Sequence, residues 1–346
     1  MTIDNYTLPR SATIMDALVK LNKILNFTLF VVDEEGKVLG SLTDGDIRRG
    51  LIAGHSPADE AYSICLKDFR YVNDANNSPR YIRQLYRLGI RLIPYLSPQG
   101  KIVKLIDLQK TSGLLPVDAV IMAGGRGERL RPLTDSLPKP LLPLGDKPIV
   151  EYNIDRMASY GITNITISVN YLGNLIKERF ANGADKEVQI RYIDEDRPLG
   201  TLGAVSMVKH FTNEVVLVMN SDLFTNIDLE EFFVHFQENR ADVAVASIPY
   251  NVTVPYAVMQ TQGELISGFD EKPTFTYYSN AGIYLIRREL LEAMTPGQHC
   301  DATDFVKQAI DTGKRVTYFP IVGYWIDIGR PEDYRKAQEY IKFMKR

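Results

Sequence analysis

Residues 117–145 read VDAVIMAGGRGERLRPLTDSLPKPLLPLG, an apolar run followed by a glycine-rich loop. The apolar run predicts a buried strand. Gly124, Gly125 and Gly127 leave backbone N–H groups open to a phosphate because they carry no Cβ. The loop is not a P-loop, since no Gly-Lys-Ser/Thr follows it, and Leu130 occupies the place of the third glycine of a dinucleotide fold. The stretch therefore predicts a phosphate-binding loop of another kind at the end of a strand.

Apolar runs alternate with amphipathic helical patterns along the following hundred residues. After VDAVIMA, the segments in order are IVEYNIDRMASYG, ITNITISVN, LIKERFAN, VQIRYI, a helix from Thr201 and EVVLVMN. This alternation predicts an α/β fold with a mostly parallel sheet covered on both faces. Ligands bind at the carboxyl ends of the strands in such sheets, so the loops after VIMA, VQIRYI and VVLVMN are expected to form the site.

Further short blocks follow the glycine loop in a fixed order. They are PKP (138–140), RPLGTLGAV (197–205), NSD (220–222), FDEKP (269–273), NAGIY (280–284) and WIDIGRPEDY (325–334). Together with GGRGERL at 124–130, they resemble the signature of the sugar-1-phosphate nucleotidylyltransferases over residues 117 to about 340. The resemblance implies a Rossmann-like nucleotidyltransferase domain. It would form an NDP-sugar and pyrophosphate from a nucleoside triphosphate and a sugar 1-phosphate.

Four charged residues in these blocks carry the catalytic roles that the resemblance implies. The reaction brings two anions together, so the site must supply positive charge and not a protein nucleophile. Arg129 and Lys139 are expected to neutralise phosphate charge. Asp222 and Asp327 are expected to hold Mg²⁺, which needs only one or two carboxylates from the protein. In the alternative interpretation, the two cations are solvated surface charges, Asp222 shapes a turn and Asp327 pairs with an arginine.

The resemblance also assigns binding residues. For the nucleotide they are Ala123, Gly124, Gly125, Gly127, Gly200 and Thr201, and for the sugar phosphate they are Glu271, Lys272, Asn280 and Gly282. The other interpretation of Glu271 and Lys272 is an exposed ion pair at a turn. Two departures from the family pattern, Ala257 after Tyr256 and Arg330 after Gly329, bear on which sugar is chosen.

An internal repeat precedes this domain. Residues 31–46 (VVDEEGKVLGSLTDGD) and 95–110 (YLSPQGKIVKLIDLQK) align about a shared Gly-Lys, and helical patterns precede them at 13–25 and 81–93. Each copy is therefore predicted to be a hairpin preceded by a helix. The segment resembles a tandem pair of CBS domains, which implies an adenine nucleotide bound in the cleft between the copies.

The first copy carries the ligand positions of that family. Thr43 and Asp46 match its ribose- and phosphate-binding residues, whereas the second copy has Asp107 and Lys110 there. The resemblance therefore implies at most one working nucleotide site. In the alternative interpretation, Thr43 and Asp46 only cap a helix that starts at Ile47.

Composition limits the remaining possibilities. The 346 residues exceed one ordinary core, and turn-forming residues near 115 predict a boundary between domains 1–114 and 115–346. A net charge of −3 disfavours nucleic acid as a partner. No apolar run reaches the roughly 18 residues of a membrane span, and the N-terminus lacks signal-peptide features, so a cytoplasmic location is expected. The two cysteines, Cys65 and Cys300, provide no disulfide framework.

Together these observations predict an enzyme. By resemblance alone, the best guess is GTP with glucosamine 1-phosphate or mannose 1-phosphate, in a pathway to surface glycans, with a regulatory CBS pair and a homo-oligomeric assembly. Two alternatives stay open: a choline-phosphate cytidylyltransferase of the same fold, and a non-catalytic nucleotide-sensing scaffold. The scaffold is expected to have lost Arg129, Lys139, Asp222 or Asp327, and all four are present.

Overall fold

The computed structural model describes residues 2–24, 27–108 and 114–344. The chain divides into two compact units, Met1–Leu114 with Ser159–Gly161, and Leu115–Ala158 with Ile162–Arg346. Lys110, assigned above to a ligand position of the second repeat, lies outside the described residues. Within the described ranges, no helix has the length and apolar character needed to cross a bilayer.

The first unit is built from two copies of one pattern. In the first copy β2 pairs parallel with β1 and antiparallel with β3; in the second copy β4 makes a parallel bridge to Val72 and pairs antiparallel with β5. A helix precedes each hairpin, as predicted. The elements are β1 (Thr7–Pro9), α1 (Ile14–Leu21), β2 (Thr28–Val32), β3 (Val38–Thr43), α2 (Asp44–Ile52), α3 (Pro79–Arg87), β4 (Leu92–Leu96) and β5 (Ile102–Asp107).

The two copies meet at their shared Gly-Lys turn. Lys37 and Lys101, which are aligned positions of the repeat, form an antiparallel bridge, and Val38 N–H donates to Gly100 C=O at 3.0 Å. Pairing between equivalent positions indicates an approximate two-fold relation between the copies. Buried side chains from both copies close the interface in one cluster, which includes Phe30, Val38, Leu92 and Leu96.

Helix α2 begins at Asp44 and not at Ile47, the start given above. Thr43 is the N-cap: its Oγ1 accepts from Asp46 N–H at 3.3 Å, and Asp46 Oδ2 accepts from Thr43 N–H at 2.8 Å. This reciprocal capping box satisfies two backbone donors and fixes the start of the helix three residues earlier. Thr13 and Asp16 form the same box at the start of α1.

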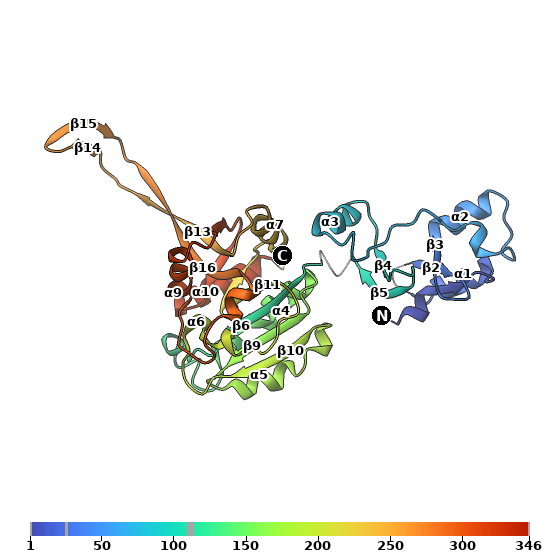
Figure 1. Ribbon diagram of the computed structural model, residues 1–346, viewed down its shortest axis with the longest axis horizontal. Helices are drawn as coiled ribbons and strands as arrows, with labels where there is room; N and C mark the ends of the chain where they lie inside the picture. Colours follow the sequence, from blue (N-terminus) through green and yellow to red (C-terminus); the bar gives the residue numbers. More distant parts are fainter. Residues whose placement is uncertain (1, 25–26, 109–113, 345–346) are drawn as a thin grey trace. The chain divides into compact units, whose positions relative to one another are not determined.

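The second unit has a seven-stranded sheet in the order β10-β9-β6-β11-β16-β13-β17 (Figure 1). Pairings are parallel except where β16 pairs antiparallel with β11 and with β13, so the mostly parallel sheet is confirmed. The sheet strands are β6 (Val117–Ala123), β9 (Asn164–Val169), β10 (Gln189–Asp194), β11 (Val215–Asn220), β13 (Val243–Thr253), β16 (Thr274–Arg287) and β17 (Val316–Pro320).

Helices and short hairpins surround this sheet. Buried residues of β6, β11, β13 and β16 pack in one cluster with residues of α8 and α9. The remaining elements are β7 (Pro143–Leu144), β8 (Lys147–Pro148), α4 (Ile149–Ser159), α5 (Gly173–Phe180), α6 (Gly200–Gly203), β12 (Leu223–Thr225), α7 (Leu229–Glu238), β14 (Val258–Gln262), β15 (Leu265–Asp270), α8 (Arg288–Glu292), α9 (Ala302–Asp311), β18 (Trp325–Asp327) and α10 (Pro331–Met344).

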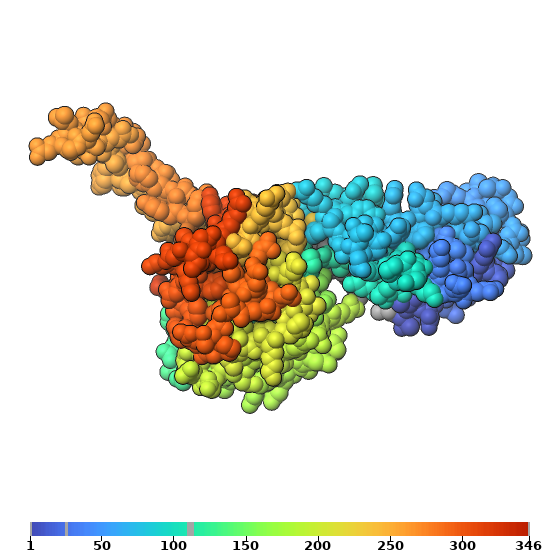
Figure 2. Space-filling model, viewed as in Figure 1, coloured from blue at the N-terminus to red at the C-terminus, as the bar shows by residue number. Residues whose placement is uncertain are grey.

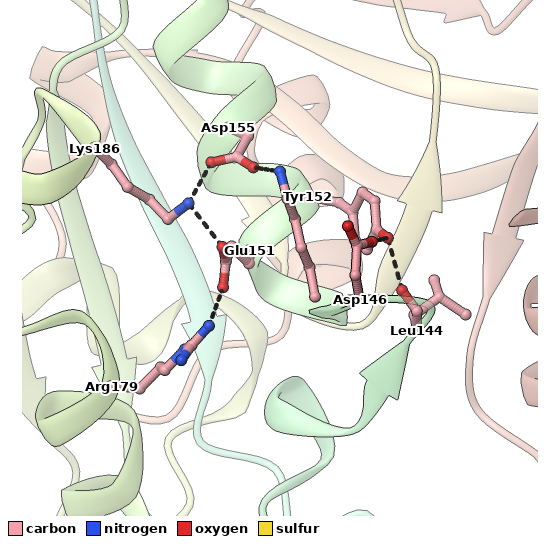
Figure 3. A network of polar contacts seen from close by, with 8 residues as sticks. Leu144, Asp146, Glu151, Tyr152, Asp155, Arg179 and Lys186 are labelled. Atoms are coloured by element: carbon pink, nitrogen blue, oxygen red, sulfur yellow. Dashed lines mark hydrogen bonds and ion pairs between the residues drawn. The ribbon is translucent and has the colours of Figure 1, made fainter. Parts of the chain in front are cut away.

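An ion-pair network holds α4 to the segments around it (Figure 3). Buried Glu151 accepts from Arg179 of α5 at 2.9 Å and from Lys186 at 2.8 Å, and Lys186 also reaches Asp155 at 2.6 Å. Burial raises the pKa of Glu151, but the bonds from Lys186 and Arg179 outweigh it and hold the pKa below its ordinary value. The network therefore stabilises the packing of α4 at neutral pH, and this contribution is lost as the pH falls through the lowered pKa.

Candidate active site

A cavity of about 620 Å³ opens at the carboxyl ends of β6 and β11. After β6 the chain builds the sheet outward through β9 and β10, then returns to the other side of β6 as β11. Open α/β sheets bind ligands at such a reversal. The loops after β6, β10 and β11, which the sequence singled out, all line the cavity; they contribute Gly124, Gly125, Arg126, Gly127, Arg129, Lys139, Glu195, Gly200, Thr201, Asn220 and Asp222.

The glycines of the first loop are set by close packing. A Cβ on Gly124 would lie 2.5 Å from Glu195 Oε1. Gly127 has a φ of +65°, and Thr134 Oγ1 donates to its carbonyl oxygen at 2.9 Å. A side chain at Gly127 would strain the backbone, and one at Gly124 would have to move the Glu195 carboxylate. Ala123 is the last residue of β6 and is buried.

Arg129, Lys139, Asp222 and Asp327 converge beside this loop. Lys139 is buried, forms an ion pair with Asp222 Oδ2, and lies 4.0 Å from Asp327 Oδ1. The two aspartates meet because β12 pairs with β18, and Ile328 N–H donates to the Asp222 carbonyl at 3.1 Å. Arg129 belongs to the same cluster, because Arg129 and Asp327 both approach Gly329. A Cβ added to Gly329 would lie within 3.5 Å of both Arg129 Nη2 and Asp327 Oδ1.

The two carboxylates suit a divalent cation. Burial raises the pKa of Asp327 and the Asp222 charge raises it further, while Lys139 and Arg129 oppose both effects. Asp222 Oδ1 is buried and has no hydrogen-bond partner among the described residues. Those residues contain no cluster of three or more His, Cys, Asp or Glu side chains able to hold a metal. The protein would therefore supply two carboxylate ligands, which is enough for Mg²⁺ when phosphate and water complete its shell.

Gly200 and Thr201 line the cavity at the start of α6, where Asp301 holds them. Gly200 has a φ of +75°, and a Cβ there would lie 2.7 Å from Asp301 Oδ1. Thr201 N–H donates to the same oxygen at 3.3 Å. Asp301 also lines the cavity, and the sequence reasoning missed it because it is separated from this loop by 100 residues.

Glu195 also lines the cavity and was not predicted. Its position directly after β10, in one of the three singled-out loops, was the signal that could have found it. Burial raises the pKa of Glu195, and hydrogen bonds from Ser168 and from Leu199 N–H oppose the rise. The carboxylate is therefore an acceptor whose charge becomes more favourable when a ligand brings donors to it.

The structure does not bring Glu271 and Lys272 to the cavity. Both are exposed, in the loop between β15 and β16, near the end of the projecting ribbon that is orange in Figure 1. The reason is the length of the β13–β16 ladder, which continues to the pair Thr253 and Thr274 and carries this loop away from the sheet.

Asn280 and Gly282 lie closer, where β16 leaves the sheet. Gly282 has a φ of +71°, and a Cβ there would lie 2.6 Å from Nδ2 of Asn220, a cavity residue. Asn280 Oδ1 accepts from Gly282 N–H at 2.9 Å, and its Nδ2 donates to Tyr284 Oη at 2.7 Å. Gly282 therefore leaves room for Asn220 at the cavity edge, and Asn280 is linked to this edge through its hydrogen bond to Gly282.

A second cavity, of about 420 Å³, lies between the two copies in the first unit. Thr43 and Asp46 line it together with Arg49, Arg70 and Arg91. The Asp46 carboxylate already accepts from Thr43 and from Arg49, the latter at 2.6 Å. Both interpretations therefore have structural support, because the two residues cap α2 and also border a cavity. Nucleotide binding there stays a prediction.

The model of the family described as Nucleotidyl transferase matches residues 118–342, which include the three loops of the larger cavity. The chain belongs to the nucleotidyl transferase family. A second match, to the CBS domain, covers residues 1–53 of this nucleotidyl transferase, which form the first copy of its repeat.

Relatives of this nucleotidyl transferase include two guanylyltransferases. Mannose-1-phosphate guanylyltransferase of Mycobacterium tuberculosis is 31% identical over 224 residues, which cover 63% of this chain and 62% of the relative. D-glycero-alpha-D-manno-heptose 1-phosphate guanylyltransferase of Aneurinibacillus thermoaerophilus is 31% identical over 232 residues, 65% of this chain and 99% of the relative. The chain thus spans less than two thirds of the first relative and nearly all of the second.

A solved structure shares the fold. HddC from Yersinia pseudotuberculosis matches with a TM-score of 0.51 at 26% identity, over 65% of this chain and 99% of HddC.

Proposed function

We propose that this nucleotidyl transferase joins a nucleoside triphosphate to a sugar 1-phosphate and releases pyrophosphate. The observation that carries the proposal is the buried Lys139 between Asp222 and Asp327, beside a glycine loop at the edge of the sheet. Cations next to a paired-carboxylate site and open backbone amides are what a reaction between two phosphates requires.

The chain's own groups act by binding and charge compensation. The amides of Gly124 and Gly125 face the triphosphate, and Arg129 and Lys139 offset its charge. An oxygen of the sugar phosphate bonds to the α-phosphorus as the bond from that phosphorus to the bridging oxygen breaks, and pyrophosphate leaves. Asp222 and Asp327 would hold Mg²⁺, which would supply further positive charge against the phosphates.

We propose that the base is guanine. Guanine presents a ring N–H next to an exocyclic amino group, so a carboxylate accepts two parallel hydrogen bonds from it. Uracil and thymine present a single N–H between two carbonyl oxygens, which a carboxylate repels. Glu195 supplies such a carboxylate, half-buried in the lining of the cavity. The names of the two relatives described above, both guanylyltransferases, support the same choice.

The sugar is proposed to be a manno-configured or 2-amino sugar 1-phosphate. Mannose 1-phosphate and a manno-heptose 1-phosphate appear in the names of the relatives, and glucosamine 1-phosphate remains from the sequence prediction. The cavity edge around Asn220 and Gly282 would select among them.

The test is pyrophosphate release across four nucleoside triphosphates and a panel of sugar 1-phosphates that also contains phosphocholine. We expect turnover with GTP and one sugar class, abolished by EDTA and restored by Mg²⁺. If the only productive pair is CTP with phosphocholine, the chain is a choline-phosphate cytidylyltransferase and the proposal is wrong. If no pair gives product at any metal concentration, the chain is a binding subunit.

We also infer that the cavity between the CBS copies takes an adenine nucleotide that adjusts activity. Three arginines line it, and their charge suits a phosphate.

A further inference from the structure

Residues 248–280 form a projecting arm. β13 pairs with β17 only as far as Ser247, and β16 pairs with β11 only from Ile283 onward. Beyond these points β13 and β16 continue as a ribbon of two strands, to which no third strand among those described is paired, with the β14–β15 hairpin at the tip. Figures 1 and 2 show the arm extending from the body of the second unit.

Beyond its first two pairs, Ile248–Ser279 and Pro249–Tyr278, the ribbon has one apolar and one polar face. Residues opposite each other on paired strands point to the same face, and successive residues alternate. The pairs Tyr250–Tyr277 and Val252–Phe275 therefore share one face. The pairs Asn251–Thr276 and Thr253–Thr274 share the other, joined by side-chain hydrogen bonds of 2.8 and 3.0 Å.

The apolar face is open in the single chain. Tyr250 and Tyr277 are 61% and 60% exposed, and Phe275 is 43% exposed. A third apolar pair, Met259–Phe269, is exposed on the tip hairpin. Isolated two-stranded ribbons are at best marginally stable in water, and contiguous apolar patches on soluble proteins mark interaction surfaces. The alternation of apolar and polar faces is that of a sheet with one buried side.

A second copy of this arm has the chemistry that such a face requires. The ribbon pairs contain no charged side chain, and the tip carries three acids and one base (Glu264, Asp270, Glu271 and Lys272), which disfavours nucleic acid or anionic lipid as the partner. The exposed parts of the four ribbon side chains and of Met259 and Phe269 on the tip hairpin amount to roughly 600 Å² per copy, taking aromatic side chains at about 150–250 Å² each. Backbone and rim atoms bring this close to the ~800 Å² per partner of a standard interface.

We propose that two copies of the chain associate through their arms, with the apolar faces packed against each other about a two-fold axis. The axis brings the aromatic pair of one ribbon against the apolar pairs of the other. The hydrogen-bonded polar faces remain in water on the outside.

Analytical ultracentrifugation of the full chain over a range of concentrations tests this association. The double variant Val252→Ser/Phe275→Ser removes two apolar side chains from the face, and the mass should fall to half that of the parent. The matched control Thr253→Ser/Thr274→Ser changes the neighbouring pair on the polar face and should keep the parent mass. Val322→Ser, at an exposed apolar residue off the arm, should keep it too.

The variant could also lose its dimer because its arm unfolds. Hydrogen exchange of the unaltered chain tests the interface without a substitution. Amides of residues 248–253 and 274–280 should exchange more slowly as the concentration rises, while the central strands show no such dependence. A parent that is monomeric at every concentration, an apolar-face variant with the parent mass, or arm protection independent of concentration would each overturn the proposal.

Discussion

Asp222 holds its two carboxylate oxygens in different surroundings. Oδ2 pairs with Lys139, whereas Oδ1 is buried without a partner among the described residues. Asp222→Asn keeps the shape and a contact for the lysine but removes the charge that a divalent cation needs. We expect kcat to fall about 100-fold or more, with little change in the melting temperature, as measured by pyrophosphate release and circular dichroism.

A matched aspartate separates this effect from a general loss of charge. Asp155 pairs with Lys147 and Lys186 outside the cavity, so Asp155→Asn should keep near-parent turnover. Near-parent turnover in Asp222→Asn itself would falsify the metal assignment.

The proposed role of Glu195 predicts how the KM for GTP depends on pH and how strongly GTP is preferred over ATP. Glu195→Gln should raise the KM for GTP about tenfold and reduce the preference for GTP over ATP, because one good bidentate contact is worth about 1–3 kcal/mol. In the parent, burial raises the pKa of Glu195, so the carboxyl takes up a proton at a higher pH than a free glutamate would. The KM for GTP should therefore rise on acidification through that raised pKa, and this rise should be absent in Glu195→Gln.

Steady-state kinetics between pH 4.5 and 8 at saturating sugar phosphate would measure both effects. The base assignment fails if the glutamine variant keeps the parent's KM and its pH dependence.

At the scale of elements, the two capping boxes of the first unit provide a matched pair. Asp46 completes the capping box of α2 at the edge of the smaller cavity, and Asp16 completes the box of α1 and is not among the residues that line this cavity. Asp46→Ala and Asp16→Ala should each lower the melting temperature, because each removes the side-chain acceptor of a capping box. Only Asp46→Ala should weaken the binding of an adenine nucleotide, as measured by calorimetry. If both variants bind the nucleotide with equal affinity, Asp46 serves only the helix start. If the parent binds no adenine nucleotide, the proposed regulatory role of the smaller cavity is wrong.

The elements also show what a sequence can and cannot predict. β6 and β11 were predictable because they are buried almost throughout and therefore read as continuous apolar runs. The arm was not, because it depends on how far β13 and β16 stay paired beyond the sheet, up to Thr253 and Thr274. At its base the pairing is irregular: Val245 opposes Tyr284, but Ser247 opposes Asn280, so β16 uses four residues where β13 uses two. No periodicity in the sequence marks this bulge or the length of the ladder, which carries Glu271 and Lys272 away from the cavity.

At the scale of the molecule, each unit has a core of its own. The clusters around Leu29 and Ile82 belong to the first unit, and the cluster around Val120 belongs to the second. Every residue that lines the larger cavity belongs to the second unit. A chain of residues 115–346 should therefore fold alone, within the usual size of a domain.

This fragment should keep the basal pyrophosphate release of the full chain and lose any response to an adenine nucleotide. The full chain should melt in two transitions and the fragment in one, since separate cores unfold separately. Calorimetry and the turnover assay on the two chains measure this. A fragment that aggregates, or one that folds but has lost most of its turnover, would show that residues 1–114 take part in the catalytic structure itself, because every proposed catalytic group is retained in the fragment.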